Sequence, residues 1–227
     1  MHDENITEKT GENMGSKIIT LIIIPCIMVF FISSCQLKKN QYQLITRKLN
    51  TITKLEQIYV AAGKEIQDIE IKELEIYERI YTFKESELEG RKNIAQKAIA
   101  LLNKRDKRID AESKLIHDID IKIEELRTIN KETKSDKLKE EVNQFIHSWQ
   151  NRTKLYDELN VKYKEAINTD LTVYNLLSQK KIDLNKIRTK TKYTNHIYKV
   201  VLKKNDKYNL YSQKLNQARK KIEDYGK

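Results

Sequence analysis

Few residue types in this 227-residue chain could carry chemistry, and the cysteines are the most informative of them. There are two, Cys26 and Cys35. Cys35 closes the run Ile32-Ser33-Ser34-Cys35, directly after an apolar stretch over residues 18–32. Cys35 is the residue of the chain with the clearest candidate chemical role.

The arrangement at Cys35 resembles a bacterial lipobox, which implies a diacylglycerol on its thiol and removal of residues 1–34 as a signal peptide. The apolar run has 15 residues, fewer than the roughly 20 that cross a bilayer as a helix. Pro25 also interrupts it. The alternative is an uncleaved anchor, because apolar residues continue loosely to Leu37. Either way we expect attachment to the cell membrane, on its extracellular face, with palmitate-type acyl chains in the lipidated form.

The first 13 residues do not fit a signal peptide, because they carry four carboxylates and one lysine. A start at Met14 gives a conventional signal, although a start at Met1 stays open. Cys26 lies within the signal and leaves with it, so the mature chain keeps one cysteine and can form no internal disulfide. Basic side chains such as Lys38, Lys39, Arg47 and Lys48 make residues 35–50 a basic stem.

Composition favours long helices. After residue 34 the chain has no proline and three glycines, with many Lys, Glu, Leu and Ile residues. Polar stretches at 82–89, 130–136 and 178–183 interrupt the pattern and predict turns. They leave four segments near 40–81, 86–130, 136–179 and 184–225.

Apolar residues recur at alternating three- and four-residue spacings, which places them on one face of a helix. The charged exceptions are Glu73 in the first stripe, Arg152 and Asp170 in a second, and Lys204 in a third. Such long amphipathic helices must bury their stripes against one another. The predicted fold is all-α, an elongated bundle of three to four long antiparallel helices with coiled-coil-like packing over residues 51–227. A parallel homodimeric coiled coil is the alternative.

No pattern in the mature chain predicts catalysis, a metal or a cofactor. His117, His147 and His196 fall on different segments and have no second ligand at metal spacing. Acidic residues that lie close together, such as Glu140 and Glu141, are typical of solvated helix faces. Trp149, Tyr156 and Tyr163 follow at seven-residue steps, which is compatible with a sugar-stacking strip but favours core packing. We therefore expect a non-enzymatic protein.

The charge distribution suggests a binding role. Without residues 1–34 the chain carries 42 basic and 29 acidic side chains, and residues 188–227 carry twelve basic against three acidic. Export would exclude nucleic acid as a partner and leave anionic wall polymers and lipid headgroups. Lys199, Lys203, Lys204 and Lys207 are the candidate polyanion contacts. A solvated basic face without a ligand is equally compatible with these residues.

Beyond these patterns, the mature chain resembles the YkyA-like family of cell-wall binding lipoproteins of Gram-positive bacteria. The resemblance rests on the Cys35 lipobox, the stretches at 107–115 and 152–166 with Asp170 and Tyr174, and the tail over 205–216. It implies an extracytoplasmic, all-helical lipoprotein that associates with the cell wall. Together with the basic charge, this makes teichoic acid or peptidoglycan the candidate partner. The resemblance implies no catalytic residues. The rival function is a helical scaffold that binds another envelope protein.

Overall fold

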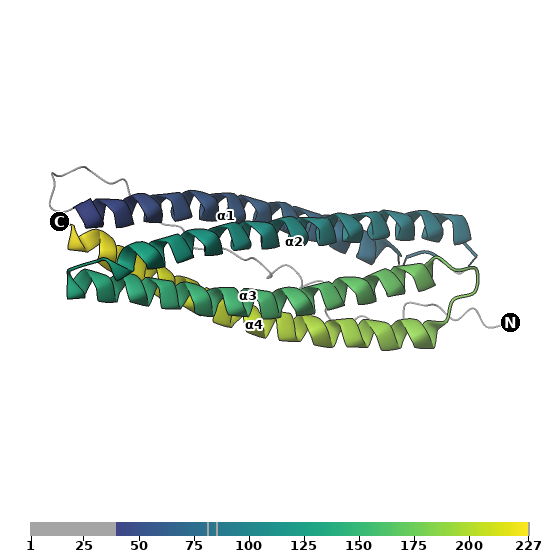
Figure 1. Cartoon of the computed structure of the whole chain (residues 1–227). Coiled ribbons are helices and arrows are strands. Elements are labelled where there is room, and N and C mark those ends of the chain that lie inside the picture. Colours follow the sequence, from purple (N-terminus) through teal and green to yellow (C-terminus); the bar gives the residue numbers. More distant parts are fainter. Residues whose placement is uncertain (1–39, 81, 85, 227) are drawn as a thin grey trace. The chain divides into compact units, whose positions relative to one another are not determined.

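The computed structural model describes residues 40–80, 82–84 and 86–226, which form four long helices (Figure 1). The helices are α1 (Asn40–Ile80), α2 (Leu88–Lys131), α3 (Asp136–Leu177) and α4 (Leu184–Tyr225). Each lies within about two residues of the predicted segment. The predicted signal peptide and Cys35 lie outside the described residues.

Short polar side chains begin two of the helices. At the start of α3 the Ser135 hydroxyl accepts the Leu138 N–H at 3.4 Å. At the start of α4 the Asp183 carboxylate accepts the Lys186 N–H at 2.9 Å. Both residues satisfy an amide that has no partner within its own helix, which fixes where the helix begins.

Contacts between the helices show that neighbours in sequence pack antiparallel. Between α1 and α2, Lys48 pairs with Glu125 while Glu65, further along α1, pairs with Arg108 at an earlier position of α2. The same inverse order holds between α3 and α4, where Glu141 contacts Lys221 and Glu158 contacts Lys204. The predicted all-helical, antiparallel bundle is therefore confirmed.

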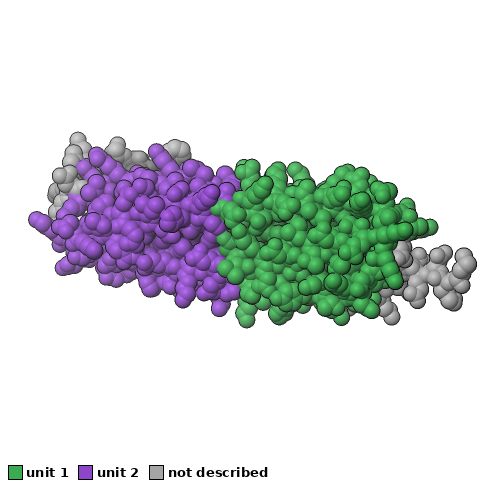
Figure 2. Space-filling model, turned by 45° about the vertical axis from the view of Figure 1, so that its right-hand side comes forward, with its two compact units in different colours: residues 1–22, 64–110, 159–203 green, residues 23–63, 111–158, 204–227 purple. Residues whose placement is uncertain are grey.

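The chain divides into two compact units, coloured separately in Figure 2. Among the described residues, unit 1 comprises 64–110 and 159–203, and unit 2 comprises 40–63, 111–158 and 204–226. All four helices contribute a segment to each unit. Each unit has its own hydrophobic core.

The buried residues follow the predicted stripes. In unit 2 the core is built from residues such as Ile52, Tyr59, Phe145, Trp149 and Leu215. In unit 1 it includes Ile80, Ala98, Tyr163, Val173 and Val201. The predicted packing role of Trp149, Tyr156 and Tyr163 is confirmed, because all three side chains are buried. They are therefore not available as an exposed sugar-stacking strip.

Candidate functional site

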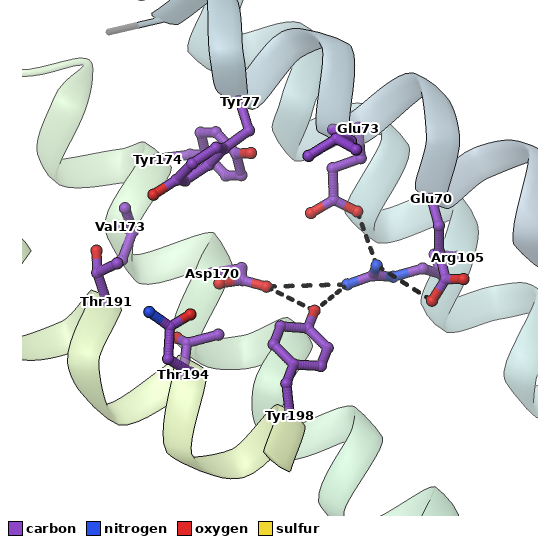
Figure 3. Close-up of a pocket in the computed structure, with 12 residues that line it drawn as sticks. Glu70, Glu73, Tyr77, Arg105, Asp170, Val173, Tyr174, Thr191, Thr194 and Tyr198 are labelled. Carbon is purple, nitrogen blue, oxygen red and sulfur yellow. Dashed lines mark hydrogen bonds and ion pairs between the residues drawn. The ribbon is translucent and has the colours of Figure 1, made fainter. Parts of the chain in front are cut away.

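The core of unit 1 contains a buried ionic cluster around Arg105, whose side chain is 1% exposed. Its guanidinium lies 2.9 Å from the Glu73 carboxylate, 3.7 Å from Glu70 and 3.9 Å from Asp170. It also donates a hydrogen bond to the Tyr198 hydroxyl at 3.0 Å, and that hydroxyl donates to Asp170 at 2.8 Å. Figure 3 shows these groups converging from all four helices. A single arginine thus connects α2 to α1, α3 and α4.

The cluster contains more acidic than basic groups, since three carboxyls surround one guanidinium. Burial raises the pKa of Glu73, and Asp170 raises it further, against the lowering effect of Arg105. Burial likewise raises the pKa of Asp170, although Arg105 and the Tyr198 hydroxyl lower it. The Tyr163 hydroxyl donates a hydrogen bond to Glu70. A charged carboxylate is costly in this core, so the cluster favours retention of protons as the pH approaches neutrality.

A cavity of about 30 Å³ adjoins the Arg105 cluster. The rest of its lining is mostly apolar or hydroxyl-bearing: Leu74, Tyr77, Val173, Tyr174, Thr191, Thr194 and Asn195. In Figure 3 the rings of Tyr77 and Tyr174 lie above the carboxylates of Glu73 and Asp170. The volume corresponds to one or two water molecules. The cavity could therefore hydrate buried carboxyls, but it is too small for a sugar or a peptide.

Unit 2 contains a second buried network, centred on Arg152. Its guanidinium lies 2.7 Å from the Glu56 carboxylate, and it donates a hydrogen bond to the Tyr208 hydroxyl at 2.9 Å. It also stacks 4.8 Å from the centre of the Trp149 ring. Glu56 accepts a second cation, Arg219. The balance is opposite to that around Arg105, because two guanidinium groups here share one carboxylate.

The two buried glutamates of unit 2 differ in their surroundings. Burial raises the pKa of Glu56, but the charges of Arg219 and Arg152 outweigh burial and leave the pKa below its ordinary value. Glu112 has no ion pair with any described residue and accepts one hydrogen bond, from the Tyr156 hydroxyl at 3.1 Å. Burial therefore raises the pKa of Glu112 to about 7, despite that hydrogen bond.

Three of the four charged residues that interrupt the predicted stripes occupy these networks; the fourth, Lys204, pairs with Glu158 instead. Glu73 and Asp170 belong to the Arg105 cluster, and Arg152 is the centre of the second network. Sequence reasoning did not identify Arg105, Glu56 or Glu112 as buried. The interruptions at 73, 152 and 170 were the available signal, since a charge on an apolar face indicates a buried partner.

The structure places the predicted polyanion contacts along one helix, α4. Lys199, Lys203 and Lys207 are exposed and form no ion pair with a described residue. Lys204 is half-buried and pairs with Glu158 at 2.7 Å. The four lysines are therefore not equivalent, and three remain available to an external anion.

Three further observations limit the chemistry of the part of the chain that the structure describes. His117, His147 and His196 are exposed. No three His, Cys, Asp or Glu side chains within 40–80, 82–84 and 86–226 are arranged to hold a metal ion. None of the four helices has an apolar stretch long enough to span a membrane.

Comparison with known proteins identifies the family. The model of the YkyA family, described as "Putative cell-wall binding lipoprotein", matches residues 40–225. The chain is also 19% identical over 199 residues to the "Uncharacterized lipoprotein YkyA" of Bacillus subtilis (strain 168), which covers 88% of this chain and 89% of that protein. No solved structure matches the chain. Because the family model covers more than four-fifths of its length, this chain belongs to the YkyA family of lipoproteins.

Proposed function

We propose that this protein is a non-enzymatic lipoprotein of the cell envelope that contacts anionic polymers of the cell wall through basic side chains of α4. Membership of a family described as cell-wall binding lipoproteins supports the general role. The choice of anionic polymers rests on the charge of the helix.

The observation that carries the proposal is the composition of α4. This helix has twelve Lys and Arg residues and three Asp and Glu residues. Its apolar stripe, with Ile187, Val201, Tyr208 and Leu215, is buried in the cores. Apart from Arg219, which pairs with the buried Glu56, the cations lie beside and opposite the buried face, where a polymer of phosphate groups can reach them. Lysine suits such a ligand because it acts as a point charge and demands no particular shape.

Attachment through Cys35 is the second part of the proposal. Diacylglycerol supplies two acyl chains, and two chains give stable anchoring where one gives marginal membrane affinity. Cys35 precedes the first residue of α1, Asn40, by five positions. The bundle would then begin almost at the membrane surface. Lys48 of the proposed basic stem pairs with Glu125, which reduces its availability to lipid headgroups.

The anchor is tested by the intact mass of protein extracted from native membranes. We expect a mature N-terminus at Cys35 that carries two or three acyl chains. A Cys35→Ala variant should lose both the mass added by these chains and retention in the membrane. An unmodified chain that starts at Met1 or Met14 would contradict the assignment.

Wall binding is tested by sedimentation of the full chain with purified walls, before and after extraction of teichoic acids. We expect retention at low salt that weakens steeply as ionic strength rises, because salt screens contacts between exposed charges. Extraction of the anionic polymers should abolish it. Retention that depends on a wall protein and is insensitive to salt would instead favour the helical scaffold.

A further inference from the structure

The most concentrated positive charge in unit 1 lies at the turn between α3 and α4 and in the first turns of α4. Thirteen residues, 180–192, contain six cations and one carboxylate. We call the cations of this segment the basic corner: Lys180, Lys181, Lys186, Arg188, Lys190 and Lys192. Five of them are exposed, and Lys190 is half-buried.

The basic corner is not neutralised by its own carboxylate. Asp183 is engaged at the helix start, where it accepts the Lys186 N–H, and it makes no ion pair with a described residue. None of the six cations forms an ion pair within the described residues. An external anion therefore meets no internal competitor that must first be displaced.

Acidic side chains on the adjacent helices do not neutralise the basic corner either. On α3, Glu165 pairs with Lys162 at 2.7 Å and accepts the Tyr193 hydroxyl, and Asp170 is held in the Arg105 cluster. On α1, Glu75 and Glu78 are exposed and make no ion pair with the corner.

The geometry of the basic corner favours a flexible chain over a flat surface. Successive helix residues are rotated by about 100°, so Lys186 and Lys190 share one flank of α4 while Arg188 and Lys192 share the other. Between the flanks, Ile187 points into the core. A polymer can pass around the helix and contact both flanks, whereas a bilayer surface meets one flank at a time.

We propose that the basic corner is the principal contact for a flexible polymer of repeated phosphodiester groups, an inference that rests on the proposed wall function. Arg188 can hold one phosphate through two parallel hydrogen bonds, and the lysines supply point charges for its neighbours. The stretch over 199–207 is a weaker site. Its four lysines are offset by Asp206 within the stretch and by Glu158, which pairs with Lys204.

The test compares two triple variants of the full chain that remove equal charge. The corner variant is Lys186→Gln with Arg188→Gln and Lys192→Gln. The matched control is Lys199→Gln with Lys203→Gln and Lys207→Gln. All six side chains are exposed, so both variants should stay folded, which far-UV circular dichroism checks. Binding to polyglycerol phosphate fixed on beads is measured in detergent, from 50 to 200 mM salt.

For a flexible polyanion, log affinity falls linearly with log salt concentration. Each cation that contacts a phosphate makes this slope steeper by about 0.7. With five contacts, the unaltered protein should weaken about 100-fold across this salt range. The corner variant should reduce that slope by about two and bind more than about tenfold more weakly at 50 mM salt. The control should change affinity by less than about threefold.

The outcomes separate the two proposals. If the unaltered protein does not bind the beads at 50 mM salt, the proposed binding of anionic polymers is wrong. If it binds and both variants weaken equally, polymer binding stands but the basic corner is not its principal contact. Mixed micelles of phosphatidylglycerol serve as a competitor. Competition as strong as that of free polymer at equal phosphate concentration would mean that the corner recognises a lipid surface, and would overturn the inference.

Discussion

Replacing Glu112 with glutamine should stabilise this protein, and the gain should depend on pH. The side chain is 3% exposed, and its Oε1 atom has no hydrogen-bond partner among the described residues. Its pKa is raised from 4.5 to about 7 because burial disfavours the charged form. Glutamine has nearly the same shape and carries no charge at any of these pH values.

The magnitude follows from the two pKa values. One pKa unit corresponds to about 1.4 kcal/mol, so the difference between 4.5 and about 7 amounts to about 3 kcal/mol. Below pH 4.5 the carboxyl is protonated in both the folded and the unfolded chain, and the native protein keeps its full stability. As the pH rises to 7 the unfolded chain ionises first, so stability is lost progressively. Above about pH 8 the loss is complete.

The assay is urea unfolding of the unaltered protein and of Glu112→Gln from pH 4.5 to 8.5. The variant should be about 3 kcal/mol more stable at pH 8 and nearly equal to the unaltered protein at pH 4.5. At pH 8 this corresponds to a rise in Tm of roughly 6–12 °C. Other titrating groups are present in both proteins and cancel in the difference. Asp118→Asn, on the exposed face of the same helix, should change stability by less than about 0.5 kcal/mol. If the difference in free energy of unfolding between Glu112→Gln and the unaltered protein does not vary with pH, the reasoning is refuted.

Three further substitutions test the buried networks and the helices. Arg105→Met removes the cation that lies among two buried carboxyls and the half-buried Asp170, and urea unfolding at pH 8 should show a loss of about 3–5 kcal/mol that shrinks as these carboxyls protonate at pH 5. Glu56→Gln should have the opposite pH dependence to Glu112→Gln. The pKa of Glu56 is lowered, so the carboxylate stabilises the fold above pH 4.5, and the variant should lose about 3 kcal/mol at pH 7 and less as the pH falls below 4. Gly63→Ala should raise stability by about 0.5–1 kcal/mol in thermal unfolding, because alanine favours the helix and its methyl would lie 3.6 Å from the nearest Glu112 atom. Unchanged stability of the Arg105→Met or Glu56→Gln variant, or a lower Tm of the Gly63→Ala variant, would contradict the reason given for that substitution.

The fold could be predicted from the sequence because local signals agreed along the whole of residues 40–225. With three glycines and no proline after residue 34, helix breaks had to fall at polar stretches, and Asp183, within one of these stretches, caps α4. The apolar stripes then required antiparallel packing. Each of these inferences depends on residues a few positions apart, which is the range over which sequence determines helix geometry.

The buried networks could be predicted only in part. Glu73, Arg152 and Asp170 stood out because each interrupts an apolar stripe. Arg105 did not, because the apolar spacing is less regular in its part of the chain. Its partners lie on three other helices, so the sequence could not reveal the cluster that they form.

A charge count on the sequence places the proposed binding surface on α4, but it does not show which cations of that helix are available to a ligand. Counting residues over 188–227 identifies a basic arm. It does not distinguish Lys204, which pairs with Glu158, from Lys186 or Arg188, which pair with no described residue. The number of cations available to a ligand is a property of the folded chain, because only folding brings an α3 carboxylate to an α4 lysine.

The two networks also explain how helices of such repetitive sequence pack in one register. A stripe of Ile, Leu and Tyr at three- and four-residue spacing would remain apolar if a helix slid by seven residues, about 10 Å along its axis. Arg105 would not tolerate that shift, because its 2.9 Å contact with Glu73 would be lost and a guanidinium would remain buried without its partner. The same holds for Arg152 and its 2.7 Å contact with Glu56. We infer that one buried ionic network in each unit fixes the register, which in turn holds the exposed cations of α4 at constant positions for a ligand.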